Sequence, residues 1–148
     1  MSRLLDWISS PRPDRGLRFL GDKGTWTFCD FESLTRRCEA FGSRIVDAKV
    51  GPNEVVCILL PTGPEFFSAI YGTWIAGGTI CPIVPPMMFE DEGAYVAHAS
   101  RILRAASPKA VVTDSAYHDL VKRILGDANR AGTVVIDADD INEANISP

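Results

Sequence analysis

The sequence has few residues of the kinds that build metal sites or disulfide scaffolds. It contains only two histidines, His98 and His118, and no CxxC pair. Both histidines fall in expected helices away from cysteines or carboxylates at ligand spacing, so we interpret them as surface residues. The four cysteines are Cys29, Cys38, Cys57 and Cys81. Cys57 and Cys81 lie inside apolar strands as small hydrophobic side chains, which favours a reducing, cytoplasmic compartment over a disulfide-bonded protein.

Clustered positive charge and a secretory signal are missing as well. The 15 basic residues are scattered and the net charge is -4, which argues against a nucleic-acid-binding surface. The first ten residues include Arg3 and Asp6 and lack a long apolar core, so we expect no signal peptide. The uncharged stretch from Phe66 to Phe89 has the length to cross a bilayer of ~30 Å. The pair Gly77-Gly78 and three prolines interrupt it, so we expect no transmembrane segment.

The sequence does contain a complete β-α-β unit between Glu54 and Pro86. Val55–Leu60 is a run of six apolar residues without alternation, typical of a strand buried on both faces in a parallel sheet. Pro64 suits the first position of a helix that Gly77-Gly78 ends. The apolar face of this helix, which we expect to be core, consists of Phe66, Phe67, Ile70, Tyr71, Trp74 and Ile75. Thr79–Val84 is then a second apolar strand, parallel to the first.

Elements of similar kind are predicted on both sides of this unit. Residues 17–20 and 25–28 form a hairpin around a four-residue turn, and Asp30 caps the helix that follows. The apolar face of that helix consists of Phe31, Leu34, Cys38, Phe41 and Ile45. Downstream we expect a helix from about Ala94 to Ser107, a strand at Ala110–Thr113, a helix capped by Asp114 or Ser115 and ending at Leu125, and a strand at Thr133–Ile136.

This order of elements predicts an α/β fold, with a mostly parallel sheet, flanking helices and an N-terminal β-hairpin. We assign residues 1–15 to an N-terminal arm, 16–137 to an α/β subdomain and 138–148 to an irregular tail. The Asp- and Asn-rich stretch from Asp137 shows no pattern, and no final helix closes the layer there. The 148 residues are therefore expected to be an incomplete portion of a larger domain.

Motifs for nucleotide binding or catalysis are not found. A dinucleotide fingerprint needs GxGxxG after a strand, whereas the turn 61–64 has one glycine and two prolines. A Walker loop and a GxSxG elbow are absent too. Thr62 or Gly63 has the position to bind an anion through the helix dipole, but we interpret it as a simple helix cap. The acidic run Glu90-Asp91-Glu92 is interpreted as a solvated loop rather than a cation site.

Two further groups of residues are of types that form sites. Ser68, Ser100 and Ser115 have no evident base partner, so none is expected to be a nucleophile. The stripe formed by Phe66, Phe67, Tyr71 and Trp74 has the character of a lipid pocket, but such helical stripes more often belong to the core. We assign no catalytic, cofactor-binding or metal-binding residue, and we expect this chain by itself to bind no cofactor.

Four ordered segments within residues 16–136 resemble the adenylate-forming enzymes, which include acyl-CoA synthetases, luciferase-like enzymes and nonribosomal peptide adenylation domains. Gly24–Phe28 and the helix that follows resemble the family's "T-Y-x-E-L" opening, and Val50–Val56 its "G-V-x-x-G-D-x-V" step. Leu60–Phe66 is similar to the "L-P-N-S-P-E-F" turn, and Ala76–Ile83 to the "A-G-A-x-x-V-P-L" strand. Pro85-Pro86, with the "LPTGPEF" form of the turn, looks most like the long-chain fatty acyl-AMP ligases.

The resemblance implies that the parent enzyme uses ATP and Mg²⁺ to convert a fatty acid to an acyl adenylate, for transfer to coenzyme A or an acyl carrier protein. The family's phosphate loop with its Lys, its aromatic-Gly-x-Thr-Glu segment, its ribose-binding Asp and its catalytic Lys come later in the chain, and none is found here. We therefore expect the first part of the large N-terminal domain of a fatty acyl-AMP ligase, inactive alone, whose main partner is the remainder of the ligase.

Two other interpretations stay open at this point. The chain has the features of a free-standing, non-catalytic module that binds a partner or itself through an exposed sheet edge or apolar surface. It also has the element order of an unrelated Rossmann-like nucleotide binder, although the missing glycine fingerprint counts against that class.

Overall fold

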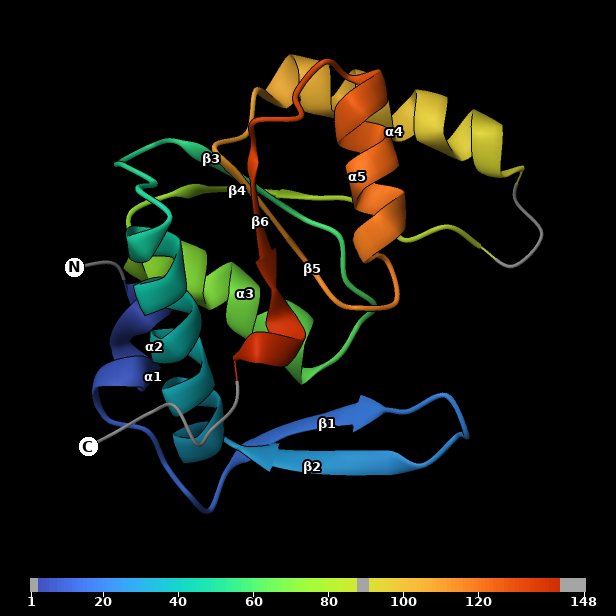
Figure 1. The fold of residues 1–148 in the computed structure, drawn as a ribbon. Coiled ribbons are helices and arrows are strands. Elements are labelled where there is room, and N and C mark those ends of the chain that lie inside the picture. The colour runs from blue at the N-terminus through green and yellow to red at the C-terminus, as the bar shows by residue number, and fades with distance from the viewer. Residues whose placement is uncertain (1–2, 88–90, 142–148) are drawn as a thin grey trace.

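The computed structural model describes residues 3–87 and 91–141, which fold into a hairpin and a parallel sheet flanked by helices (Figure 1). The strands are β1 (Gly16–Leu20), β2 (Trp26–Asp30), β3 (Val55–Ile58), β4 (Thr79–Pro82), β5 (Ala110–Thr113) and β6 (Val134–Asp137). The helices are α1 (Asp6–Ser9), α2 (Phe31–Asp47), α3 (Pro64–Ile75), α4 (Glu92–Ala106) and α5 (His118–Asp127), with 3₁₀ turns η1 (Arg3–Leu5) and η2 (Ala138–Asp140). The predicted α/β class is confirmed.

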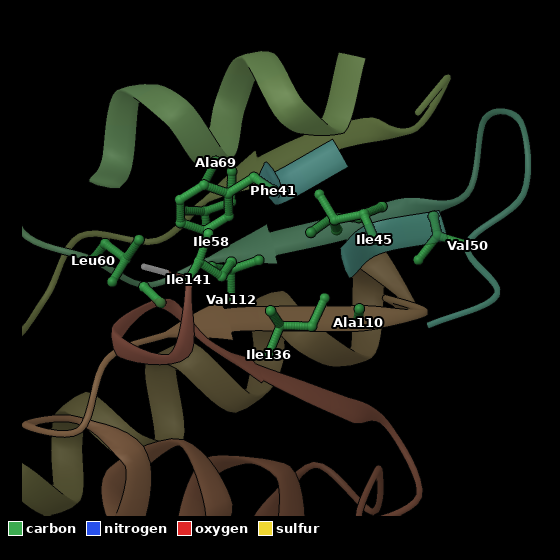
Figure 2. Close-up of a cluster of buried hydrophobic side chains, with 12 residues drawn as sticks. Phe41, Ile45, Val50, Ile58, Leu60, Ala69, Ala110, Val112, Ile136 and Ile141 are labelled. Carbon is green, nitrogen blue, oxygen red and sulfur yellow. The ribbon is translucent and has the colours of Figure 1, made fainter. Parts of the chain in front are cut away.

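The four-stranded sheet is parallel throughout, in the order β4-β3-β5-β6. Alternate residues of β3 point to opposite layers, because successive side chains of a strand face opposite sides. Val56 and Ile58 lie in the cluster on the side of α2 and α3, whose members Figure 2 shows. Cys57 and Leu59 lie in a second cluster, with residues of α4 and α5. The unalternating apolar run therefore fills a core on each face of the sheet.

The buried face of α3 is not the aromatic stripe that the sequence predicted. Its fully buried residues are Ser68, Ala69, Gly72 and Thr73. These small side chains let α3 approach α2 so closely that a Cβ atom at Gly72 would lie 2.5 Å from the Cβ of Phe41 and 2.8 Å from the backbone nitrogen of Gly42. Of the predicted face, Phe66 and Ile70 do pack against the core cluster. The prediction is wrong for the fully buried face, because it ranked faces by hydrophobicity, whereas close helix packing requires small residues.

Two aromatic side chains of α3, those of Phe67 and Tyr71, are half-buried against the N-terminal segment. The Trp7 ring lies 5.1 Å from that of Tyr71, 5.8 Å from that of Phe67 and 5.1 Å from that of Phe31 in α2. The ring of Phe19 in the hairpin also contacts Phe67, with the ring centres 6.4 Å apart. Residues of four elements thus form an aromatic cluster that fastens α1 and the hairpin to the helical layer.

The start of α5 also differs from the prediction. Neither Asp114 nor Ser115 is its N-cap, because the helix begins at His118. The Asp114 carboxylate instead accepts a hydrogen bond from the backbone N–H of Tyr117 at 3.1 Å, which closes a turn before the helix. The N–H of Ser115 is bonded to Asp139 at 3.0 Å. Ser115 is thus paired with η2 instead of capping the helix, and the N-cap of α5 is Tyr117.

The expected lack of structure from Asp137 onward is wrong for the first residues of that stretch. Asp137 ends β6, and its carboxylate accepts a hydrogen bond from the N–H of Asp139 at 2.9 Å, which caps η2. Ala138 and Ile141 are buried in the same cluster as Phe41. Residues 142–148 of the predicted tail lie outside the described residues.

Asp30 caps α2 as predicted, and its removal should weaken the fold in a pH-dependent way. Its carboxylate accepts hydrogen bonds from the backbone N–H and the hydroxyl of Ser33, both at 2.8 Å. These bonds lower the pKa of Asp30. The stabilisation is therefore complete above the unfolded pKa of about 3.9 and is lost as the pH falls through the lower folded pKa. We expect Asp30→Ala to cost about 1 kcal/mol in urea unfolding at neutral pH.

Asp30→Asn is the matched control for this measurement, because asparagine caps helices but does not titrate. It should keep most of the stability at neutral pH and flatten the acid side of the stability profile. Equal acid sensitivity in the native chain and Asp30→Asn would show that Asp30 does not carry this pH dependence.

Candidate functional site

A cavity of about 420 Å³ opens at the carboxyl ends of the central strands. The chain leaves β3 toward β4 on one side of it and later adds β5 on the other, so the order of the sheet reverses between β3 and β5. Ligands of open α/β sheets bind outside the carboxyl ends of the strands at such a reversal. The cavity wall is formed by Phe19, Leu20, Gly21, Asp22, Thr27, Leu60, Pro61, Thr62, Gly63, Pro64, Glu65, Asp114 and Asp139.

Three parts of the chain build this wall. The hairpin closes one side, and the turn between β3 and α3 forms the floor. Gly63 is the N-cap of α3 without a side-chain hydrogen bond, and Pro64 occupies the first turn, where its missing N–H costs nothing. Asp114 and Asp139 follow the ends of β5 and β6. The predicted role of Pro64 is confirmed, and the backbone of Gly63 rather than the Thr62 side chain starts the helix.

Carboxylates dominate the electrostatics of the cavity. Burial raises the pKa of Asp114, and the nearby charges of Asp139 and Asp137 raise it further. Asp139 behaves in the opposite way, because hydrogen bonds from Ser115 lower its pKa. Glu65 is paired with Arg37 of α2 at 3.0 Å. Negative charge thus gathers on the side of the cavity formed by the ends of β5 and β6.

This lining does not fit a triphosphate. It holds four carboxylates, those of Asp22, Glu65, Asp114 and Asp139, and none of the lining residues is Lys, Arg or His. Anion binding at a helix N-terminus requires free N–H groups and no competing negative charge. Within residues 3–87 and 91–141, no three His, Cys, Asp or Glu side chains gather where they would hold a metal ion. The lining of this one cavity therefore does not complement the charge of a triphosphate.

The two histidines have different surroundings in the structure. His98 is exposed on α4, as predicted. His118 is half-buried, with its Nδ1 atom 4.0 Å from a carboxylate oxygen of Asp137 and with no hydrogen-bond partner among the described residues. The expected separation of His118 from carboxylates is therefore wrong, although 34% of its side chain remains exposed at the surface. Its neighbour comes from β6, which sequence spacing along α5 does not reveal.

The serines occupy structural positions. Ser68 is buried at the interface of α3 with α2, where its hydroxyl interacts with the thiol of Cys38. The hydroxyl of Ser100 donates to the backbone oxygen of Ile124 at 3.2 Å, and Ser115 bonds to Asp139 through its N–H.

Two residues of the predicted acidic loop, Asp91 and Glu92, lie at the start of α4. Asp91 is its N-cap, accepting a hydrogen bond from the N–H of Ala94 at 2.8 Å. Glu92 pairs with Arg123 of α5 on the surface. Glu90 lies outside the described residues. These two carboxylates thus point to different partners, as expected of a run that is not a cation site.

No motif in the sequence predicts the cavity itself. Its acidic residues come from four separate segments, and no two of them share a motif. One signal was available, since Asp114 comes directly after the strand Ala110–Thr113 and Asp137 closes β6. Carboxyl ends of parallel strands meet at one sheet edge, so two such aspartates predict a shared acidic edge.

Comparison with known proteins identifies the family. The family model described as AMP-binding enzyme matches residues 10–148, which is most of the chain. The chain belongs to the AMP-binding enzyme family. This match confirms the resemblance to adenylate-forming enzymes seen in the sequence. It also excludes the interpretation of the chain as an unrelated Rossmann-like nucleotide binder. No curated protein matches the sequence.

Solved structures of adenylate-forming enzymes share the fold of this AMP-binding family member. One comes from work on fatty acyl-adenylate ligases of E. coli and L. pneumophila, with a TM-score of 0.79 and 20% identity over 97% of this chain. A fatty acid AMP ligase from Legionella pneumophila has a TM-score of 0.72 and 21% identity over 95%. The acyl-CoA synthetase of Brucella canis has a TM-score of 0.64 and 25% identity over 82%.

The chain spans about a quarter of the length of these enzymes, since the match covers 26%, 23% and 20% of the three solved chains. The fold of this AMP-binding family member is thus a portion of the ligase architecture. None of the helices in the described parts of the chain has the length and hydrophobicity to cross a membrane.

Proposed function

We propose that this chain is the first part of the large N-terminal domain of a fatty acyl-AMP ligase. The observation that supports this most directly is the fold shared with a fatty acyl-adenylate ligase over 97% of the chain at a TM-score of 0.79. The proline-rich turn at residues 61–64 and Pro85-Pro86 add a sequence resemblance to the same group.

The parent enzyme would join a fatty acid carboxylate to the α-phosphate of ATP, releasing pyrophosphate. The acyl adenylate would then pass its acyl group to the thiol of coenzyme A or of an acyl carrier protein. We place this enzyme in the cytoplasm, where the four cysteines would stay as the free thiols of the structure. In it, the 148 residues would support the active site as scaffold, in contact with the remainder of the ligase.

The chain alone should be inactive. Adenylyl transfer depends on cations and N–H groups positioned around developing negative charge. The cavity at the carboxyl edge presents Asp114 and Asp139 instead, and no basic residue is among those that line it. Negative charge there would raise the energy of a phosphate-centred transition state rather than lower it.

Incubation of the purified chain with ATP, Mg²⁺ and fatty acids of several lengths tests this prediction. We expect neither acyl-AMP by mass spectrometry nor pyrophosphate release above a protein-free blank. The full-length ligase that contains this sequence is the positive control and should form both products. Acyl-AMP formation by the 148-residue chain would contradict the proposed inactivity. If the full-length enzyme forms no acyl-AMP, the proposed reaction is contradicted.

One observation favours a second function, that of a non-catalytic assembly module. In the hairpin, Leu20 pairs with Trp26 and Arg18 with Phe28, which places these side chains on one face. Leu20 is 54%, Trp26 60% and Phe28 48% exposed, and the Arg18 guanidinium lies 5.6 Å from the centre of the Phe28 ring. Apolar side chains exposed together on a sheet face are typical of a protein contact.

Under this second function, the chain should associate with itself through the hairpin face, in a concentration-dependent way. Trp26→Thr with Phe28→Thr keeps strand propensity, removes the aromatic rings, and should abolish the association in sedimentation experiments. Val46→Gln with Ile75→Gln is the matched control, because it alters two exposed apolar residues on α2 and α3. A monomer at every concentration would exclude the self-assembling module.

A further inference from the structure

Two of the four cysteines lie side by side on neighbouring strands. In the parallel pairing of β3 with β4, Cys57 stands directly opposite Cys81. Both side chains belong to the hydrophobic cluster on the sheet face covered by α4 and α5, so they point the same way. Both are free thiols. Neither residue has a role in the cavity at the carboxyl edge.

The pairing brings the two residues within the range of a disulfide. Neighbouring strands of a sheet lie about 4.8 Å apart. Disulfides join residues whose Cα atoms are roughly 4.4–6.8 Å apart, with Cβ atoms at roughly 3.5–4.5 Å. Registered residues on one sheet face meet the first condition, and a small approach of the two Cβ atoms meets the second. No strand has to change its register.

The two thiols differ in their access to solvent. Cys57 is fully buried in the central strand, whereas Cys81 is half-buried in β4, at the edge of the sheet. Burial, together with the neighbouring Cys81, raises the pKa of the Cys57 thiol, which keeps it protonated and slow to react with a dissolved oxidant. An oxidant from solvent therefore meets Cys81 first, and Cys57 is the thiol positioned to react next.

The other two cysteines do not offer this arrangement. Cys38 is fully buried in α2, and burial raises its pKa to about 12. Cys29 lies in β2, in the separate two-stranded sheet, where Leu17 is its registered partner. Cys57 and Cys81 are thus the pair that the strand register holds together.

We propose that Cys57 and Cys81 are a redox modification site at which a peroxide forms an intramolecular disulfide between β3 and β4. In the first step the Cys81 sulfur attacks the peroxide O–O bond, giving a sulfenic acid and one molecule of water when the oxidant is hydrogen peroxide. In the second, the Cys57 sulfur attacks the Cys81 sulfur and expels a second water. The two thiols are oxidised and the peroxide is reduced. This inference does not depend on the adenylating activity.

The disulfide would tie the edge strand β4 to the centre of the sheet. It would close a covalent loop around segment 58–80, which contains the crossover helix α3. Closing a loop of this length restricts the unfolded chain, so the oxidised form should be harder to unfold. Oxidation would then stabilise the β-α-β unit against unfolding.

The test is treatment of the folded chain with hydrogen peroxide, followed by alkylation of the remaining thiols in denaturant. We expect a product lighter by two hydrogens that takes up two alkyl groups instead of four, and a Tm higher by about 5 °C. Cleavage after Glu65 separates the two cysteines in sequence, so peptides 55–65 and 66–90 should stay joined until a reductant is added. A product joined through Cys29 or Cys38, or four free thiols after oxidation, would overturn the proposal.

Two variants test whether Cys57 and Cys81 are the residues that form the disulfide. Cys57→Ala should stop the reaction at the Cys81 sulfenic acid, which a dimedone probe labels, and should lose the rise in Tm. Cys57→Ala with Cys81→Ala leaves Cys29 and Cys38 as a control pair and should give no disulfide. An unchanged yield of intramolecular disulfide in either variant would contradict the assignment to Cys57 and Cys81.

Discussion

Replacing Phe41 with alanine should lower the free energy of unfolding by about 3–5 kcal/mol. Phe41 is 2% exposed and lies in the cluster where α2 and α3 meet the sheet, with Ala69 and Ile58 among the surrounding residues (Figure 2). Truncation removes the ring and leaves a cavity between the layers, because α2 is held in place along the rest of its length. Urea unfolding followed by circular dichroism measures the loss.

Val46→Ala is the matched control for Phe41→Ala. It removes an apolar side chain from the same helix, but Val46 is 54% exposed and lies outside the buried clusters. Its effect should stay within about 0.5 kcal/mol. Similar losses in the two variants would show that the cluster around Phe41 is not a packed core.

Replacing Gly72 with alanine should cost about 3 kcal/mol, because one methyl group would be forced between two packed helices. Its Cβ would lie 2.5 Å from the Cβ of Phe41, 2.8 Å from the backbone oxygen of Cys38 and 2.8 Å from the backbone nitrogen of Gly42. Two of these three atoms belong to the backbone, so no side-chain rotation relieves the overlap. The helices would have to separate, and the free energy of unfolding should fall accordingly.

Gly126→Ala is the control for the helix propensity of alanine. Gly126 is exposed in α5, and a Cβ atom there would have no atom within 4 Å. Alanine should stabilise this helix by about 0.5–1 kcal/mol. Both substitutions replace glycine with alanine. If they change the free energy of unfolding in opposite directions, the difference is due to the contact between α2 and α3. A gain of stability in Gly72→Ala would refute the close packing.

Much of the secondary structure could be predicted because its signals are local. Asp30 before an apolar helix, Pro64 at a helix start and glycine at position 77 act through their own backbone geometry, and the structure has each in the expected role. The uniform apolar runs at Val55 and Ala110 indicated strands buried on both faces, which the two clusters confirm. These features depend on neighbours a few residues away.

The candidate site could not be predicted in the same way. Its wall joins the hairpin at Phe19 to Glu65, Asp114 and Asp139, segments that share no sequence motif. The same holds for His118, whose neighbour Asp137 belongs to another strand. Cys57 and Cys81 were interpreted as separate hydrophobic residues, because their alignment follows from the register of β3 with β4.

The sequence by itself determined the order of helices and strands, the parallel sheet and the family, since periodicity, caps and ordered motifs are properties of the chain read in one dimension. The tertiary structure decided which surfaces meet. It buried the small face of α3 against α2, left Trp26 exposed and brought the carboxylates to one edge. The physical reason is that close packing and electrostatic proximity depend on distances between segments far apart in the chain.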